Sequence, residues 1–161
     1  MKLKRSLACL VAAACIVLTG CDYDAPLTDK PTHKVDARLL GDWVAMDPDA
    51  KQEEVMHVRA FDDATYAVAI DNDIYRAYHS DFAGLPLLSV QDLNSDARKY
   101  CLYTWALSPD AARLTLRRVS TKVIPDTTKT GAELQKLIQA NLANPNLLEK
   151  ELLFTRKPHH F

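Results

Sequence analysis

The sequence contains few glycines, and it lacks the short motifs on which several kinds of catalysis depend. Only four of its 161 residues are glycine, and none of them forms a glycine-rich loop that could hold a phosphate group. The patterns Gly-x-Ser-x-Gly, His-Glu-x-x-His and Cys-x-x-Cys are all absent, which removes the usual signs of a hydrolase, a zinc protease and a dithiol site. We therefore predict that the protein is not an enzyme, and we assign no catalytic residue.

Charge of either sign is nearly balanced, and the longest apolar run is short. The chain has 20 Lys and Arg against 21 Asp and Glu, a net charge of −1. Because it has no basic cluster, we expect no nucleic-acid partner. The apolar run from Leu7 to Leu18 covers about 12 residues, whereas roughly 20 are needed to cross the hydrocarbon core of a bilayer. A permanent transmembrane helix is therefore not expected there.

This short run lies between a basic start and a cysteine. Three of the first five residues are Lys or Arg, and Leu18-Thr19-Gly20-Cys21 follows the run. This order resembles the signal peptide and lipobox of bacterial lipoproteins. The resemblance implies that residues 1–20 are removed and that the Cys21 thiol carries a covalent lipid, which stands in place of any other cofactor. The alternative is a buried helix in a cytosolic protein, but charge, length and cysteine position together favour the signal.

A chain that begins at Cys21 has consequences for membrane attachment. It would keep 17 Lys and Arg against 21 Asp and Glu, a net charge of −4, so a basic surface could not hold it to anionic lipid. Attachment would then depend on the acyl chains at Cys21, of which two or more hold stably. The resemblance implies a periplasm-facing protein of the bacterial cell envelope. Asp22 resembles the signal that retains enteric lipoproteins in the inner membrane, with the outer membrane as the alternative.

The cysteine count agrees with that interpretation. Cys9 and Cys15 would leave with the signal and Cys21 would be acylated, so we expect no intrachain disulfide even in an oxidising compartment. Cys101 is interpreted as a small apolar residue packed in a strand, and the alternative is a reactive thiol.

The remaining chain divides into a tether, one domain and a tail. Residues 21–37 have two prolines, many polar groups and no apolar period, so we predict a flexible tether that cannot bury enough surface to order itself. Residues 38–157 form a single domain in this prediction, and residues 158–161 form the tail.

The domain is predicted to be mainly β. Seven short segments, divided by Asp, Asn, Pro and Gly turns, have the composition of strands: residues 39–46, 55–61, 65–70, 74–79, 87–91, 100–107 and 113–119. Their spacing leaves no room for crossover helices, which predicts an antiparallel up-and-down meander. Thr130 and Glu133 have the spacing of a capping box and predict a helix over about 131–143. A last strand at 151–155 could pair with the first strand and close a small β-barrel.

The first predicted strand opens with Leu40-Gly41-Asp42-Trp43. This pattern resembles the Gly-x-Trp motif of lipocalins and related calycin barrels. The resemblance implies that Trp43 plugs the base of the barrel and that an arginine near the last strand, Arg156, stacks over it. Several small bacterial lipoproteins share this layout, including a Tyr-x-Leu-Tyr strand, here at Tyr100, and a Phe-x-Arg ending.

Polar candidates for a metal site are sparse. His159 and His160 could bind a metal but lie in a short tail, and His57 is expected on the solvated face of its strand. Residues 62–63 and 71–73 are rich in Asp and Asn, but they stand where strands must turn. We therefore assign no metal ion.

The aromatic residues leave two interpretations open. Tyr66, Tyr75, Tyr103 and Trp105 lie on predicted strands, where they could line a ligand cavity or fill a solid core, and the core is favoured. A filled barrel agrees with a non-enzymatic envelope lipoprotein that contacts another envelope protein. An open barrel would suit a lipocalin-like carrier of a small apolar or lipid ligand.

Overall fold

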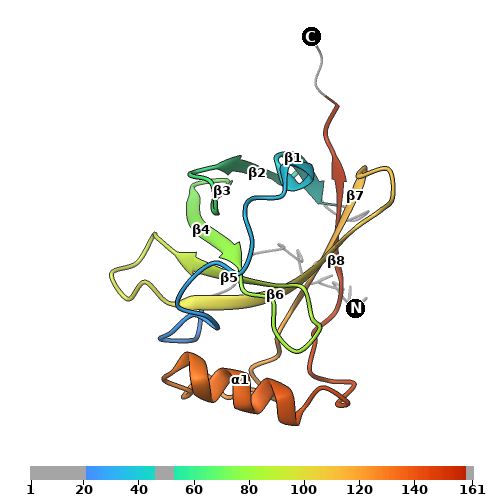
Figure 1. Cartoon of the computed structure of the whole chain (residues 1–161). Coiled ribbons are helices and arrows are strands. Elements are labelled where there is room, and N and C mark those ends of the chain that lie inside the picture. The colour runs from blue at the N-terminus through green and yellow to red at the C-terminus, as the bar shows by residue number, and fades with distance from the viewer. Residues whose placement is uncertain (1–20, 46–52, 159–161) are drawn as a thin grey trace, which may run out of the picture.

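The computed structural model describes residues 21–45 and 53–158 (Figure 1). The predicted signal at residues 1–20 lies outside the described residues, and so do His159 and His160.

Eight strands form one closed antiparallel barrel in the order β1 to β8, so the predicted fold class is confirmed. The closed meander is compatible with a lipocalin-like fold. The strands are β1 (Gly41–Ala45), β2 (Val55–Ala60), β3 (Thr65–Ile70), β4 (Asp73–His79), β5 (Leu87–Asp92), β6 (Tyr100–Leu107), β7 (Arg113–Arg118) and β8 (Leu152–Arg156). A short 3-10 helix, η1 (Ala37–Leu39), precedes β1, and α1 (Gly131–Ala140) lies between β7 and β8.

Every second side chain along the strands points into the barrel, and these side chains fill its interior. Met56 and Val58 on β2 are buried, as are Leu114 and Leu116 on β7, and the residues between them are not. Such alternation is typical of strands with one face toward a core. The barrel closes where Trp43, Val44 and Ala45 of β1 pair with β8, which removes the exposed edges of an open sheet.

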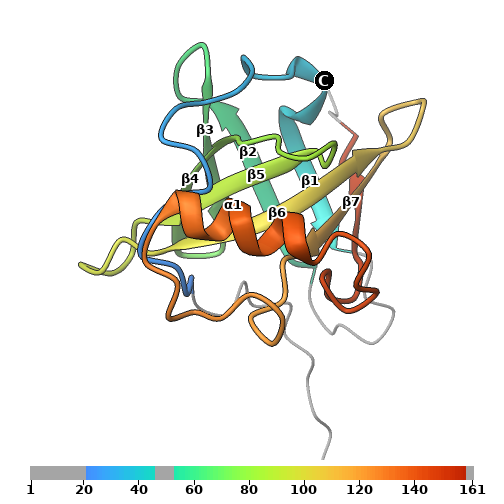
Figure 2. The ribbon, with the colours of Figure 1, turned by 60° about the horizontal axis from the view of Figure 1, so that its bottom comes forward.

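A second core lies outside the barrel, under α1. Leu134 and Ile138 of α1 are fully buried together with Leu87 of β5 and Leu102 of β6. Figure 2 shows α1 lying across these strands. The helix therefore covers the outer face of the sheet and does not enter the barrel.

Helix α1 is shorter than the predicted 131–143. Its start agrees with the capping signal, because the Thr130 side chain accepts a hydrogen bond from the Glu133 backbone N–H. Asn141 ends it: this residue has non-helical backbone angles, and its side-chain amide donates to the Leu137 carbonyl at 2.9 Å. An asparagine that bonds to the last turn competes with continuation of a helix.

The segment predicted to be a flexible tether packs against the barrel instead. Tyr23 is 1% exposed and Leu27 is fully buried, both in the core beneath α1. The Tyr23 hydroxyl donates to the Ile124 carbonyl at 2.9 Å, and its backbone forms a β-bridge with Tyr100. Although residues 22–36 are mostly polar, the two large side chains of Tyr23 and Leu27 bury enough apolar surface to order the segment. Figure 1 shows the segment crossing the outside of the barrel toward η1.

Replacement of Leu27 tests this docking. We expect Leu27→Ala to lower the free energy of unfolding by about 2–5 kcal/mol, because it removes a fully buried side chain. Leu142→Ala is the matched control, since Leu142 is 38% exposed, and we expect it to cost less than about 1 kcal/mol. Urea denaturation measures both. Equal, small losses would mean that the segment is not docked.

Candidate functional site

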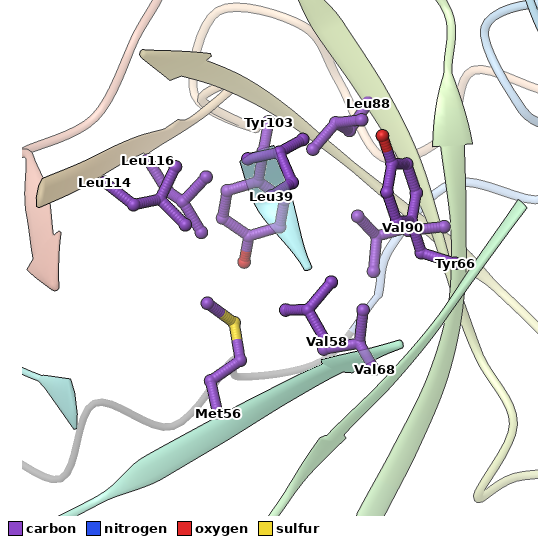
Figure 3. Close-up of a pocket in the computed structure, with 11 residues that line it drawn as sticks. Leu39, Met56, Val58, Tyr66, Val68, Leu88, Val90, Tyr103, Leu114 and Leu116 are labelled. Carbon is purple, nitrogen blue, oxygen red and sulfur yellow. The ribbon is translucent and has the colours of Figure 1, made fainter. Parts of the chain in front are cut away.

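The barrel interior holds an apolar cavity of about 60 Å³ (Figure 3). Eleven residues line it, and nine of them are aliphatic or methionine; the other two are Tyr66 and Tyr103. One buried water needs roughly 10–15 Å³ on a comparable measure, so the space equals that of a few waters. Typical ligand pockets measure about 300–1,000 Å³. The interior is therefore mostly filled by side chains.

The four aromatic residues predicted for the cavity or core separate into two pairs. Tyr66 and Tyr103 are among the lining residues, and Figure 3 shows the Tyr103 hydroxyl pointing toward Met56. Tyr75 is buried in the same core, and Trp105 packs against it, but neither is among the lining residues. Burial raises the pKa of Tyr103 well above its ordinary value, so its hydroxyl keeps its proton at neutral pH.

Trp43 and Arg156 meet at one end of the barrel. The guanidinium carbon of Arg156 lies 4.2 Å from the centre of the Trp43 ring, a cation–π contact of about 0.5–2 kcal/mol. The Trp43 indole N–H donates to the Leu39 carbonyl at 2.9 Å. Arg156 also donates to the carbonyls of Leu40 and Ala111, at 2.6 and 2.9 Å. This pair thus ties η1, β8 and the β6–β7 turn together, which is a structural task.

Gly41 is required by the same contact. A Cβ atom on Gly41 would lie 2.6 Å from Nη1 of Arg156, and the φ angle of Gly41 is +140°. Only glycine adopts such an angle at little cost.

Two glycine substitutions test how strictly each position requires glycine. Gly84 also has a positive φ, of +79°, but a Cβ there would meet nothing within 4 Å. We expect both Gly41→Ala and Gly84→Ala to destabilise the barrel through backbone strain. Gly41→Ala should cost at least about 1 kcal/mol more, because it also displaces Arg156 and because alanine tolerates a φ of +140° less well than one of +79°. Urea titration of the two variants measures the difference, and equal losses would show that Arg156 does not need this space.

A polar group lies in the same end of the barrel, around His79. The Asp36 backbone N–H donates to the Tyr66 hydroxyl at 2.7 Å, and that hydroxyl lies 2.6 Å from Nε2 of His79. The Tyr66 hydroxyl can donate its proton to Nε2 or accept one from it, according to the tautomer of the His79 ring. Burial lowers the pKa of His79, so its ring is neutral and carries one proton, on either Nδ1 or Nε2.

Two buried nitrogens beside this contact have no hydrogen-bond partner in the described part of the chain. Nδ1 of His79 and the indole Nε1 of Trp105 are both buried, and neither has a hydrogen-bond partner there. The two rings lie 5.4 Å apart, centre to centre. Leaving a buried donor unsatisfied costs free energy. The indole N–H of Trp105 therefore suits an oxygen atom that accepts a hydrogen bond, and Nδ1 of His79 can donate or accept according to its tautomer. The sequence contained no local signal for this group, because its members come from β3, β4 and β6.

Cys21 lies at the other end of the barrel and is partly exposed. Its Sγ lies 3.5 Å from the Val90 carbonyl, with the geometry of a weak hydrogen bond. Two effects raise the pKa of the Cys101 thiol: a hydrogen bond with the Cys21 thiol, which is the larger effect, and burial. Cys101 therefore stays protonated and unreactive. The carboxylate of Asp22 forms an ion pair with Arg118. Cys21 is therefore held against the barrel by its neighbours.

The remaining polar candidates do not gather into a site. His57 lies 2.9 Å from Asp42 on the outer surface, and Asp62 accepts hydrogen bonds from the backbone of its own turn. Within residues 21–45 and 53–158, no three His, Cys, Asp or Glu side chains could together hold a metal ion. No helix in this part of the chain is long and apolar enough to cross a bilayer.

No family model, curated protein or solved structure matches this chain. Its function must therefore be inferred from its own residues: Cys21 and Asp22 at one end of the barrel, the small interior cavity, and the group around His79 at the other end.

Proposed function

We propose that this protein is a lipid-anchored lipoprotein of the bacterial cell envelope that faces the periplasm and contacts another envelope protein without catalysing a reaction. The observation that carries the proposal is the position of Cys21. Cys21 is a partly exposed residue that packs against one end of a folded barrel, directly after a segment with the order of a lipoprotein signal. A lipid on that sulfur would attach to the domain itself.

The surroundings of Cys21 are compatible with a thioether. Transfer of a diacylglyceryl group from a membrane phospholipid to Sγ forms a carbon–sulfur bond and breaks the bond from the glyceryl carbon to the phosphate oxygen, so the phosphate headgroup and the thiol proton leave. The weak hydrogen bond to the Val90 carbonyl would be lost, but the thioether could still accept a hydrogen bond from the Cys101 thiol. Acylation would also prevent a disulfide between the two neighbouring cysteines.

The outer surface offers positions for a protein contact. Phe61 is 70% exposed after β2, and Leu153 is 42% exposed on β8. Because side chains fill most of the interior, the surface is the better place for a partner. Inner-membrane retention is the localisation we propose, with the outer membrane as the alternative. Asp22 also has a structural reason to be acidic, namely its ion pair with Arg118.

Intact-mass measurement of protein purified from its native membranes tests the anchor. We expect a chain that lacks residues 1–20 and carries the added mass of a diacylglyceryl group. Cys21→Ser should carry no lipid mass and should lose its normal membrane distribution, whereas Cys101→Ala is the matched control that keeps both. A native chain that still begins at Met1 without added lipid would overturn the proposal.

We also infer a second candidate, a carrier of a small molecule, from the cavity and the two buried nitrogens without a partner. Tyr66 both lines the cavity and contacts His79, so an apolar space lies close to two buried nitrogens, of which the indole N–H of Trp105 is a donor. This combination suits a short apolar body that ends in a carbonyl or carboxylate oxygen. The volume of about 60 Å³ is too small for a complete fatty acyl chain.

Organic extraction of the purified protein followed by mass spectrometry tests the carrier. A carrier should release a small molecule in stoichiometric amount, and Leu116→Trp, which would fill the cavity, should release none. Extracts in which the two proteins do not differ would exclude the carrier and leave only the surface function.

A further inference from the structure

We propose that one defined end of the barrel faces the lipid bilayer. This anchor end comprises Cys21, the β3–β4 turn at residues 71–72 and the β5–β6 loop at residues 93–99. The opposite end, where Phe61 follows β2, would be directed away from the membrane toward a partner. The inference rests on the proposed lipidation of Cys21, and it adds an orientation that lipidation alone does not require.

The first step is that almost no free chain separates Cys21 from the barrel. The backbone N–H groups of Asp22 and Tyr23 donate to the Tyr100 carbonyl at 3.1 and 3.0 Å, and the Tyr100 N–H donates back to the Tyr23 carbonyl at 2.8 Å. Asp22 is also paired with Arg118. An extended residue spans at most about 3.6 Å, so a lipid on Cys21 begins within about two residue lengths of β6.

The second step is that the next residues are also held. The Leu27 N–H donates to the Ser89 hydroxyl at 3.1 Å, and the Leu27 carbonyl accepts from the Gln135 side chain at 2.8 Å. Lys129 lies 2.6 Å from the Asp24 carboxylate. Residues 21–27 are thus bound to both the barrel and α1, so a pull on the lipid is transmitted to the whole domain.

The third step identifies the end. Successive turns of an antiparallel meander alternate between the two ends of a barrel. Tyr100 begins β6, directly after the β5–β6 loop, and Ile74 is the second residue of β4, directly after the β3–β4 turn. Both lie at the end that holds Cys21. Phe61 and the Trp43–Arg156 contact lie at the other end.

Exposure alone would give the opposite orientation. Phe61 is 70% exposed and Ile74 is 52% exposed, so the more apolar tip is remote from Cys21. A single side chain cannot outweigh two or more acyl chains, which hold a protein stably at a membrane. The position of the lipid anchor therefore determines which end of the barrel faces the membrane. Ile74 is the exposed apolar side chain at that end.

Charge does not oppose this placement. The anchor end carries both signs: Arg76, Arg98, Asp71, Asp73 and Asp96 are exposed there, and Lys99 is partly exposed. A balanced surface is neither attracted to nor repelled from anionic headgroups to a large extent. The orientation should accordingly be the same in neutral and in anionic membranes.

Fluorescence quenching by lipid tests the orientation. The full lipidated protein, with either Ile74→Cys or Phe61→Cys, is labelled with an environment-sensitive dye and reconstituted in phosphatidylcholine vesicles that contain spin-labelled headgroups. The two positions are matched, since both are exposed apolar residues next to a hairpin turn, and buried Cys101 should not react. We expect the dye at position 74 to be quenched at least twofold more than the dye at position 61.

A variant with an inserted linker shows whether the short connection between Cys21 and the barrel causes the orientation. Ten Gly and Ser residues inserted between Cys21 and Asp22 would allow the barrel to move by roughly 17–19 Å, and we expect the difference between the two dyes to disappear. Equal quenching without the linker, or stronger quenching at position 61, would overturn the orientation alone. Intact mass and vesicle flotation establish the lipid on Cys21 beforehand, and their failure would overturn the proposed function together with the orientation.

Discussion

The backbone pairing of Tyr23 with Tyr100 is the contact on which the arrangement of this molecule depends. It occupies the edge of β6 beyond the point where β7 ends, and the ion pair of Asp22 with Arg118 lies beside it. Without this pairing, Cys21 would begin a free coil and the barrel could turn in any direction. With this pairing, Cys21 is held against one end of the barrel.

Two cores divide the structural tasks. The inner core fills the barrel and is closed at one end by Trp43 under Arg156. The outer core joins the N-terminal segment, α1 and the outer faces of β5 and β6. Because Leu102 of β6 belongs to the outer core and Tyr103 to the inner one, a single strand connects them. Loss of packing under α1 would therefore weaken the hold on Cys21 and leave the barrel closed.

Local patterns predicted the parts of this structure that depend on neighbouring residues. Alternation and turn residues predicted the closed meander, and the motif around Trp43 predicted its contact with Arg156. Tyr23 and Leu27 gave no such signal, because two apolar residues among prolines and acids have no period, and their partners lie about 60 to 100 residues away. The group around His79 was missed for the same reason. The end of α1 was missed because the Asn141 side chain competes with the helix.

Hydrogen exchange at the Tyr23 and Tyr100 backbone amides tests the central claim most directly. Each amide donates to the backbone carbonyl of the other residue. In the native, membrane-derived protein, we predict that both exchange as slowly as amides in the middle of β6, because opening them requires the outer core to come apart. Exchange of the Tyr23 amide at the rate of an unstructured peptide, with β6 still protected, would contradict the account.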